Sequence, residues 1–319
     1  MAVPLRADAA KARAGAAPPV VSSYREYRPG PGAPEAVACA WHGIAGWSRR
    51  LRVLPDGCLE LVWDGRHARA VLPVPGPARY PVSVEAQTTG IRIQPGWGAI
   101  VLGAPLRHLA GVTNLVNLWD TATARHLEAA LAAAPDAAAR RRLLSRAVAC
   151  RLAAAGPPDP AVLGVVRLLS QPRASVSEAA RHVHLSGRQL RRRFADHVGL
   201  PPKALQAVLR FQRLRVQLAS AGTAQVTLAR AAADCGYFDQ AHLCHDSARL
   251  AGVTPTELLC PRPQPTAGTR PEPSAIPDEL VPGRPRRPGA ARHPTGSSGL
   301  AARNDSRDGH SQTGQEGRS

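Results

Sequence analysis

Two segments about fifty residues apart carry the same helix–turn–helix pattern, and this repetition restricts the fold more than any other feature of the chain. In the first segment, "SVSEAARHV" places Ser175 three residues before Glu178, and "LSGRQLRRRF" places Ser186 three residues before Gln189. Both spacings are capping boxes, which mark the starts of helices. The sequence therefore predicts two short helices across a tight turn, the second spanning residues 187–197.

The second of these helices places a run of arginines beside an aromatic residue. Leu190 and Phe194 are one helical turn apart, so we expect both to face inward. The arginines then occupy the other faces and point outward: Arg188, Arg191, Arg192 and Arg193. This pattern is typical of a recognition helix, whose N-terminal half lies on base edges in the major groove. An arginine-rich face is more often only a solvated surface, so one such pattern is weak support.

The second segment, "QVTLARAAADCGYFDQAHLCHDSARLAG", strengthens the interpretation. We expect a helix with Val226, Ala229 and Ala233 facing inward, a turn at residues 235–236 and an N-cap at Asp239. Between the two segments, "PPKALQAVLRFQRLRVQLASAG" predicts one long connecting helix. Two such motifs on a rigid link are a specific signature of DNA binding.

The charge of the chain is strongly positive and unevenly distributed. Lys and Arg total 41 against 23 Asp and Glu, a formal net charge of +18, and nearly all the basic residues are Arg. A GC-rich genome explains part of this excess. Residues 173–215, however, hold ten basic and two acidic residues, a net of +8, whereas residues 223–260 hold two and four, a net of −2. Duplex DNA is the partner that such a cluster favours, with the first motif supplying most of the charge.

The remaining sequence predicts an α+β architecture. Short apolar runs broken by Pro and Gly, such as "CLELVWD" and "GIRIQPG", indicate strands, and long Ala, Leu and Arg stretches from Thr121 onward indicate helices. "AAGPPDPAV" is a natural hinge. We expect a flexible arm over 1–22, a β-rich N-terminal domain with a helical extension over 23–156, and an all-α tandem helix-turn-helix domain over 157–261. The Pro-, Gly- and Ser-rich remainder, 262–319, is predicted to be a disordered tail.

The cysteine and hydropathy patterns limit the class of protein. The six cysteines are scattered without a paired C-x-x-C spacing, which favours a reduced cytoplasmic protein. The sequence has no run of about 18 or more apolar residues, so it predicts no membrane span. Nothing in the pattern calls for a cofactor or a metal.

Residues 173–260 resemble the tandem helix-turn-helix domain of AraC/XylS-type transcription regulators. The motifs that carry the resemblance are "LSGRQLRRRFADHVGLPPKAL" and "AADCGYFDQAHLCHDSARLAGVTPTEL". The upstream half is similar to an N-terminal domain found on a bacterial branch of these regulators, through "YREYRPGP", "LPDGCLELVWD" and "IQPGWGAIVLGAPLRHL". The role of that domain is poorly defined, so this second resemblance implies architecture more than function.

The resemblance also implies the DNA-binding positions. In the first recognition helix they are Ser186 and Gln189 at the cap, with Arg188, Arg191 and Arg192 facing the bases. In the second they are Gln240, Ala241, Cys244 and His245. Position 245 is commonly Arg in such regulators, and Ser247 stands where they usually keep a core aromatic. We therefore expect the second motif to bind DNA more weakly.

The resemblance further implies partners. Duplex DNA comes first, and the N-terminal module is a candidate site for a small-molecule effector or for dimer contacts. RNA polymerase is a candidate partner as well. The sequence leaves open the effector, the operator, the sign of regulation and the oligomeric state.

An enzyme is the alternative interpretation. A DNA-repair alkyl acceptor joins a cysteine nucleophile to the same DNA-binding module, and Cys39 or Cys58 is the candidate here. Such proteins hold several cysteines on zinc near the acceptor, whereas only these two precede Cys150. We therefore expect a regulator without catalytic activity.

Other candidate chemistry has simpler explanations. Cys58 has His42, His67 or Glu60 as candidate partners of a reactive thiol, but a small buried cysteine is commoner. Four residues gather in "CGYFDQAHLCH", namely Cys235, His242, Cys244 and His245, at a spacing that is wrong for a zinc finger. The tryptophans of the β-rich half are candidates for lining a ligand pocket but more often build a small core: Trp41, Trp47, Trp63 and Trp97.

Overall fold

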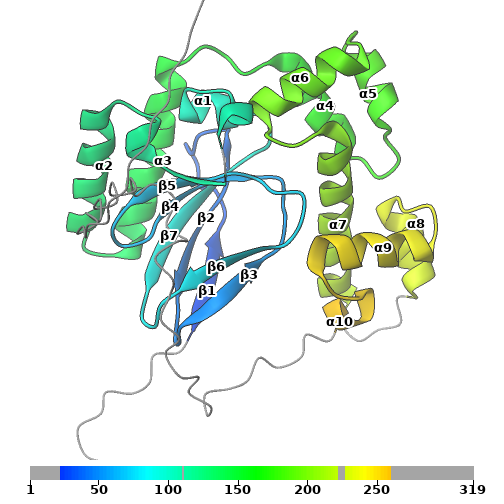
Figure 1. Cartoon of the computed structure of the whole chain (residues 1–319), viewed down its shortest axis with the longest axis horizontal. Helices are drawn as coiled ribbons and strands as arrows, with labels where there is room; N and C mark the ends of the chain where they lie inside the picture. The colour runs from blue at the N-terminus through cyan, green and yellow to red at the C-terminus, as the bar shows by residue number, and fades with distance from the viewer. Residues whose placement is uncertain (1–21, 110, 222–226, 260–319) are drawn as a thin grey trace, which may run out of the picture. The chain divides into compact units, whose positions relative to one another are not determined.

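The computed structural model describes residues 22–109, 111–221 and 227–259 (Figure 1). A β-rich part precedes a helical part, as the sequence predicts. The predicted N-terminal arm, apart from its last residue, and the predicted C-terminal tail lie outside the described residues. None of the described helices combines the length and the apolar character needed to cross a membrane.

The described strands form two antiparallel sheets. In chain order they are β1 (Ser23–Tyr27), β2 (Val37–Ile44), β3 (Arg49–Val53), β4 (Leu59–Trp63), β5 (Ala68–Val71), β6 (Ala78–Val82), β7 (Gln87–Ile93) and β8 (Val112–Asn114). The larger sheet has six strands in the order β1-β2-β7-β4-β5-β8, and β3 pairs with β6 in a two-stranded sheet.

The helices fall into two groups along the chain. Those of the N-terminal part are α1 (Gly98–Leu102), α2 (Thr121–Ala133) and α3 (Ala137–Ala154), with short 3-10 turns η1 (Leu106–His108) and η2 (Leu115–Asn117). Those of the C-terminal part are α4 (Pro160–Leu169), α5 (Val176–His182), α6 (Gly187–His197), α7 (Pro202–Ala221), α8 (Leu228–Cys235), α9 (Gln240–Ala251) and α10 (Pro255–Leu259).

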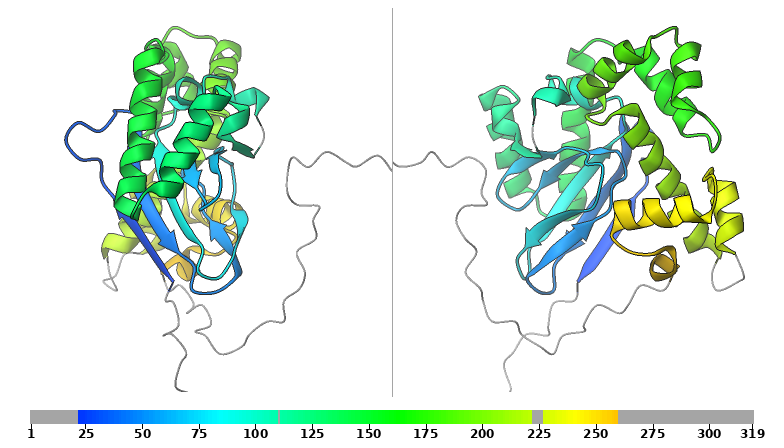
Figure 2. Two further views of the ribbon diagram at one scale, coloured as in Figure 1. Left: turned by 90° about the vertical axis from the view of Figure 1, so that its left-hand side faces the viewer. Right: turned by 45° about the vertical axis from the view of Figure 1, so that its right-hand side comes forward.

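One face of the six-stranded sheet forms the core of the N-terminal part. Along β4, Leu59, Leu61 and Trp63 are buried and alternate with partly exposed residues, the period of a strand with one covered face. Ile93 and Ile91 stand opposite the first two on β7. Helices α2 and α3 pack on the sheet and contribute buried leucines to the same cluster (Figure 2). The predicted helical extension therefore completes the β-rich core.

The long helix α7 joins the two halves of the helical part. Leu205, near its start, belongs to the core that α4, α5 and α6 form. Val208, Phe211 and Leu214, farther along, belong to the core that α8 and α9 form. Because one continuous helix runs through both cores, the predicted connecting helix is confirmed.

The predicted inner face of α8 is wrong. Ala229 and Ala233 are exposed, and the buried residues of the helix are Ala231, Ala232 and Cys235. The helix begins after the N-cap Thr227 and packs against α7 and α9. This packing buries the residues at positions i, i+1 and i+4, of which the first two belong to a run of alanines. Because neighbouring alanines look alike in sequence, apolar periodicity could not place the inner face. Val226, the third predicted inward residue, lies outside the described residues.

Candidate nucleic-acid interface

The first helix-turn-helix motif consists of α5 and α6. Ser175 Oγ accepts the N–H of Glu178 at 3.1 Å, and Glu178 Oε2 accepts the N–H of Ser175 at 2.9 Å. This reciprocal cap fixes where α5 starts. Its apolar residues and the one at its C-cap belong to or pack against the core of this half: Val176, Ala179, Ala180 and Val183. His184 at φ +52° makes the tight turn toward α6.

The N-terminus of α6 is capped in the same way. Ser186 Oγ accepts the N–H of Gln189 at 3.3 Å, and Gln189 Oε1 accepts the N–H of Ser186 at 2.9 Å. Both side chains are exposed. Since the cap already engages the amide oxygen of Gln189, its amide NH₂ group is the part left to donate to a phosphate or a base.

The apolar anchor and the arginine face of α6 lie as expected, with one exception. Leu190 and Phe194 are fully buried. Arg188, Arg191 and Arg192 are exposed, at positions i, i+3 and i+4, so they share one helical face. None of these three guanidinium groups has an ion pair with a described residue.

Arg193 is the exception, because it does not point outward as predicted. Its Nη1 atom donates to Asp159 Oδ2 at 3.0 Å. Asp159 is the N-cap of α4, where its carboxylate also accepts the N–H groups of Ala161 and Val162. Residue 193 is rotated about a quarter turn around the helix axis from Arg192 and therefore faces α4. This arginine therefore fastens the recognition helix to the domain, and the exposed set is smaller than the sequence predicts.

The second motif, α8 and α9, depends on a glycine at its turn. Gly236 closes α8 with φ +84°, and a Cβ atom there would lie 1.9 Å from the carbonyl oxygen of Pro172. Only glycine fits, because the turn packs directly against the loop between α4 and α5. Asp239 then caps α9 as predicted, since its Oδ1 atom accepts the N–H of His242 at 2.7 Å.

The predicted DNA-binding positions of α9 lie mainly on its surface. Gln240, Ala241 and His245 are exposed, and Cys244 is partly buried against the core of this half. Ser247 is completely buried, at the position where the family resemblance leads one to expect an aromatic. The exposed face of α9 is therefore polar, and its one arginine, Arg249, lies a turn after His245 and is paired with Asp246.

Asp246, in the middle of α9, is buried and fully paired. Its two carboxylate oxygens accept from Arg210 Nη2 of α7 at 2.9 Å and from Arg249 Nη2 at 2.8 Å. Burial alone would raise the pKa of Asp246, but the hydrogen bonds from Arg249 and Arg210 outweigh it and hold the pKa below its ordinary value. The −2 net charge counted for this segment therefore overstates the negative field at its surface.

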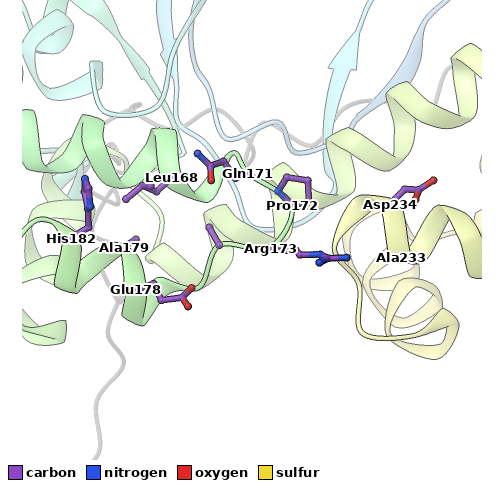
Figure 3. Close-up of a pocket in the computed structure, with 10 residues that line it drawn as sticks. Leu168, Gln171, Pro172, Arg173, Glu178, Ala179, His182, Ala233 and Asp234 are labelled. Atoms are coloured by element: carbon purple, nitrogen blue, oxygen red, sulfur yellow. The ribbon is translucent and has the colours of Figure 1, made fainter.

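An open groove of about 680 Å³ lies between the two motifs (Figure 3). Gln171 and Arg173, both from the loop after α4, line it together with Glu178 of α5 and Asp234 of α8. Figure 3 shows Arg173 reaching from this loop toward the second motif. A neighbouring hollow of about 460 Å³ shares Arg173 and extends to Phe238 in the turn before α9. The groove has both acidic and basic side chains, so its lining alone favours no ligand.

The N-terminal part contacts both motifs. Arg107 of η1 forms an ion pair with Asp196 of α6. Gln212 of α7 donates to the carbonyl oxygen of Pro55 at 2.5 Å, and Leu54 packs against the core of the second half. The N-terminal part therefore contacts α6 directly and contacts the second half through α7 and its core.

Neither Cys39 nor Cys58 lies in surroundings that activate its thiol. Burial raises the pKa of Cys58 well above its ordinary value, and burial also raises that of Cys39. The partners considered for Cys58 are engaged elsewhere: His42 with Thr89, His67 with Glu128, and Glu60 with Arg92. A neutral thiol without a base is a poor nucleophile.

The tryptophans serve mainly as core residues. Trp63 and Trp97 belong to the core of the N-terminal part. Trp41 is buried against Gly90, where a Cβ atom would lie 2.4 Å from its ring. Trp47 is partly exposed, with the guanidinium of Arg49 4.4 Å from its ring centroid. These positions give the tryptophans a packing role.

Two of the four residues considered for zinc, Cys235 and His242, are engaged elsewhere. The Sγ atom of Cys235 donates to Gln217 Oε1 at 2.9 Å, and the ring of His242 lies against Arg210 and Tyr237. Within the described part of the chain, no group of three or more His, Cys, Asp or Glu residues is placed to hold a metal ion.

Comparisons with known proteins agree with this arrangement of two parts. Residues 179–259 match the family described as "Helix-turn-helix domain", and residues 25–114 match "Domain of unknown function (DUF6597)". No curated protein matches the chain.

Solved structures of ToxT from Vibrio cholerae are similar to this chain. An apo form with one substitution, from strain SCE256, is 10% identical with a TM-score of 0.38 and covers 71% of this chain and 98% of its own. ToxT from strain O395 is 8% identical with a TM-score of 0.36, covering 67% and 94%. Wild-type ToxT with an unsaturated fatty acid bound is 10% identical with a TM-score of 0.37, covering 67% and 92%.

Proposed function

We propose that this chain is an AraC-type transcription regulator and that it binds duplex DNA with α6 and α9 in two successive major grooves. The match of residues 179–259 to a helix-turn-helix domain supports the proposal. The observation that carries the proposal is the division of α6 into two faces. Leu190 and Phe194 anchor it, while Arg188, Arg191 and Arg192 stand free on one exposed face. Arginines held at one-turn spacing on a fixed helix suit guanine O6 and N7 atoms in the major groove.

The cap of α6 supplies the phosphate contacts in this proposal. Ser186 and Gln189 are exposed at the N-terminus, where the helix dipole favours an anion. Phosphate contacts set the register of the helix on DNA, and the arginines then read the bases. In α9, Gln240, Ala241, Cys244 and His245 take the equivalent places.

The connecting helix fixes the spacing of the two recognition helices. Because α7 is continuous and contributes to both cores, the motifs are joined rigidly. Motifs that read successive major grooves must lie roughly one DNA turn, about 34 Å, apart. We therefore propose one asymmetric binding site with a half for each helix.

The N-terminal module is the regulatory part in this proposal. Its contacts with α6 and α7 give an effector, a second copy or RNA polymerase a route to the DNA-binding helices. We retain residues 23–156 and 157–261 as the proposed domain limits, and we place the protein in the cytoplasm, where a regulator meets chromosomal DNA.

We also propose that the chain has no catalytic activity. The raised pKa values of Cys39 and Cys58 and the engagement of His42, His67 and Glu60 in other contacts speak against the alkyl-acceptor alternative.

Selection of bound sequences from a randomised duplex library by the full chain, at several salt concentrations, tests the proposal. Affinity should fall steeply with salt, because arginine contacts release counterions. A variant with three substitutions, Arg188→Ala, Arg191→Ala and Arg192→Ala, should lose sequence preference, because it removes the proposed guanine contacts.

A matched variant separates recognition from total charge. Arg125, Arg142 and Arg146 are exposed on α2 and α3, so replacing these three with alanine removes the same charge away from α6. This control should keep the preference of the wild type. Equal losses in the two variants, or no enriched sequence with the wild type, would contradict the proposal.

A further inference from the structure

Phe238 is an aromatic side chain with no packing role in the folded protein. It is 92% exposed, more than any other large apolar side chain among the described residues. It lies in the turn between α8 and α9, directly before the N-cap Asp239. Neither the arginine pattern nor the family positions singled it out, because its exposure is a property of the folded turn.

The usual structural explanation for an apolar residue at this place does not apply. A residue before the N-cap often packs on the fourth helical residue as a hydrophobic staple. That fourth residue is Leu243, which other side chains bury completely. A side chain that is 92% exposed cannot cover it, so Phe238 contributes almost nothing to the stability of the helix.

The turn nevertheless holds Phe238 in a fixed position. The N–H of Phe238 donates to His242 Nδ1 at 3.3 Å, and the N–H of His242 donates to Asp239 Oδ1 at 2.7 Å. With Gly236 packed against Pro172 on the other side, the backbone presents the phenyl ring to solvent at the start of α9.

We propose that Phe238 is a specificity-determining residue that contacts the C5-methyl group of a thymine in the second half of the binding site. This inference rests on the proposed DNA-binding function. The N-terminal residues of a recognition helix face base edges, and Phe238 lies two residues before the first residue of α9, Gln240. The thymine methyl is the apolar feature of the major groove, and phenylalanine is one of the side chains that contact it.

The neighbouring residue supports the same half-site chemistry. Gln240, exposed at the first position of α9, has the amide geometry that pairs with adenine N6 and N7. Phe238 and Gln240 together favour A·T pairs, whereas the arginines of α6 favour guanine. The two halves of the site therefore differ in base composition as well as in affinity.

Deoxyuridine, which lacks only the methyl group, tests the proposal on DNA selected by the wild-type full chain. Thymines in the half bound by α9 are replaced one at a time. One replacement should weaken wild-type binding about four-fold, the worth of one buried methyl group. Phe238→Ala should bind the thymine site at least about four-fold more weakly and should show no further loss on deoxyuridine. Phe238→Leu should fall between the two.

Val216→Ala is the matched control, because Val216 is 66% exposed on α7, outside the recognition helices. It should keep the affinity and the response to deoxyuridine of the wild type. The thermal unfolding midpoint of Phe238→Ala should equal that of the wild type, which distinguishes the removal of a DNA contact from damage to the fold.

Three results overturn the inference. Phe238→Ala could bind like the wild type, could lose affinity equally on thymine and deoxyuridine, or could unfold at a lower temperature. The second result would indicate a sugar or backbone contact. Failure of the proposed function is distinguishable, because the wild type would then enrich no sequence in the selection at all.

Discussion

The two helix-turn-helix motifs share a backbone pattern but present different surfaces to a ligand. The helix α6 exposes Arg188, Arg191 and Arg192 on one face. The helix α9 exposes Gln240 and His245, and its own Arg249 is tied to Asp246. One helix presents charge, and the other presents directional or apolar groups. These surfaces suit two different half-sites, so a repeated motif need not bind the same DNA sequence twice.

The two helices are also held in place differently. Apolar packing of Leu190 and Phe194 anchors α6, and the pair between Arg193 and Asp159 lies near the surface. In α9, the buried Asp246 bonds to Arg210 of the connecting helix, while the Oγ atom of the buried Ser247 has no hydrogen-bond partner among the described residues. Since a buried charge is costly without its partner, the second half depends more on one ion pair.

The largest effect should follow from breaking that pair. Asp246→Ala leaves Arg210 buried without its carboxylate and should lower the free energy of unfolding by about 3 kcal/mol, the cost of an uncompensated buried charge. Chemical denaturation of the full chain measures it. Binding to the second half of the DNA site should weaken at the same time.

Asp234→Ala is the control for that change. The side chain of Asp234 is half exposed, and its Oδ2 atom lies 3.8 Å from Arg230 Nε. Loss of this surface pair should lower the free energy of unfolding by less than about 1 kcal/mol. Equal destabilisation by the two substitutions would mean that Asp246 does not fasten α9 to α7.

Base recognition should show a smaller and more local asymmetry. Arg192→Ala should remove about 1–3 kcal/mol of discrimination at one base pair in the first half, the range for a bidentate arginine contact. His245→Ala should do much less, because the two nitrogens of an imidazole point away from each other and cannot both contact one base as a guanidinium does. A randomised operator library at fixed salt measures both variants.

Arg193→Ala provides the matched comparison on α6. It removes the same charge as Arg192→Ala, but its guanidinium bonds to Asp159 and not toward DNA. Base preference should stay unchanged, with a slight loss of stability. The asymmetry is wrong if His245→Ala costs as much as Arg192→Ala, and the division of the arginines is wrong if Arg193→Ala shifts preference.

The smallest effect should be the dependence of stability on pH between about 7.5 and 5.5. Burial lowers the pKa of His197 in the first half and of His242 in the second, so both take up protons more readily when unfolded. Their contribution to the free energy of unfolding is complete above the pKa of about 6.5 in the unfolded chain. It is lost as the pH falls toward the lower pKa values in the folded protein. The unfolding midpoint should therefore decrease on acidification.

Single substitutions show which half of the helical part causes the pH dependence of the unfolding midpoint. His197→Gln and His242→Gln should each flatten the curve of midpoint against pH. Glu60, whose pKa burial raises, acts in the opposite sense, and His42, whose pKa burial lowers, acts in the same sense; both are common to all three proteins. A curve that neither substitution flattens would place the dependence on other groups.

Local patterns predicted the motifs, and the structure confirms them where the cause is local. The caps at Ser175, Ser186 and Asp239 depend on side chains within three residues of one another, which a sequence displays directly. The pair Leu190 and Phe194 needs only the helical repeat. The DNA-binding positions stay a prediction that rests on the resemblance and on exposure.

The sequence by itself determined the order of the elements, the helix starts and the position of the charged cluster, because propensity, capping and periodicity act over a few residues. Only the tertiary structure decided which of the adjacent residues Arg192 and Arg193 is free, which alanines of α8 are buried, that Asp246 is neutralised by Arg210, and that Phe238 stands in solvent. Each of these depends on a partner, or the lack of one, from a helix distant in sequence. A local sequence pattern does not show which residues far apart in the chain come into contact in the fold.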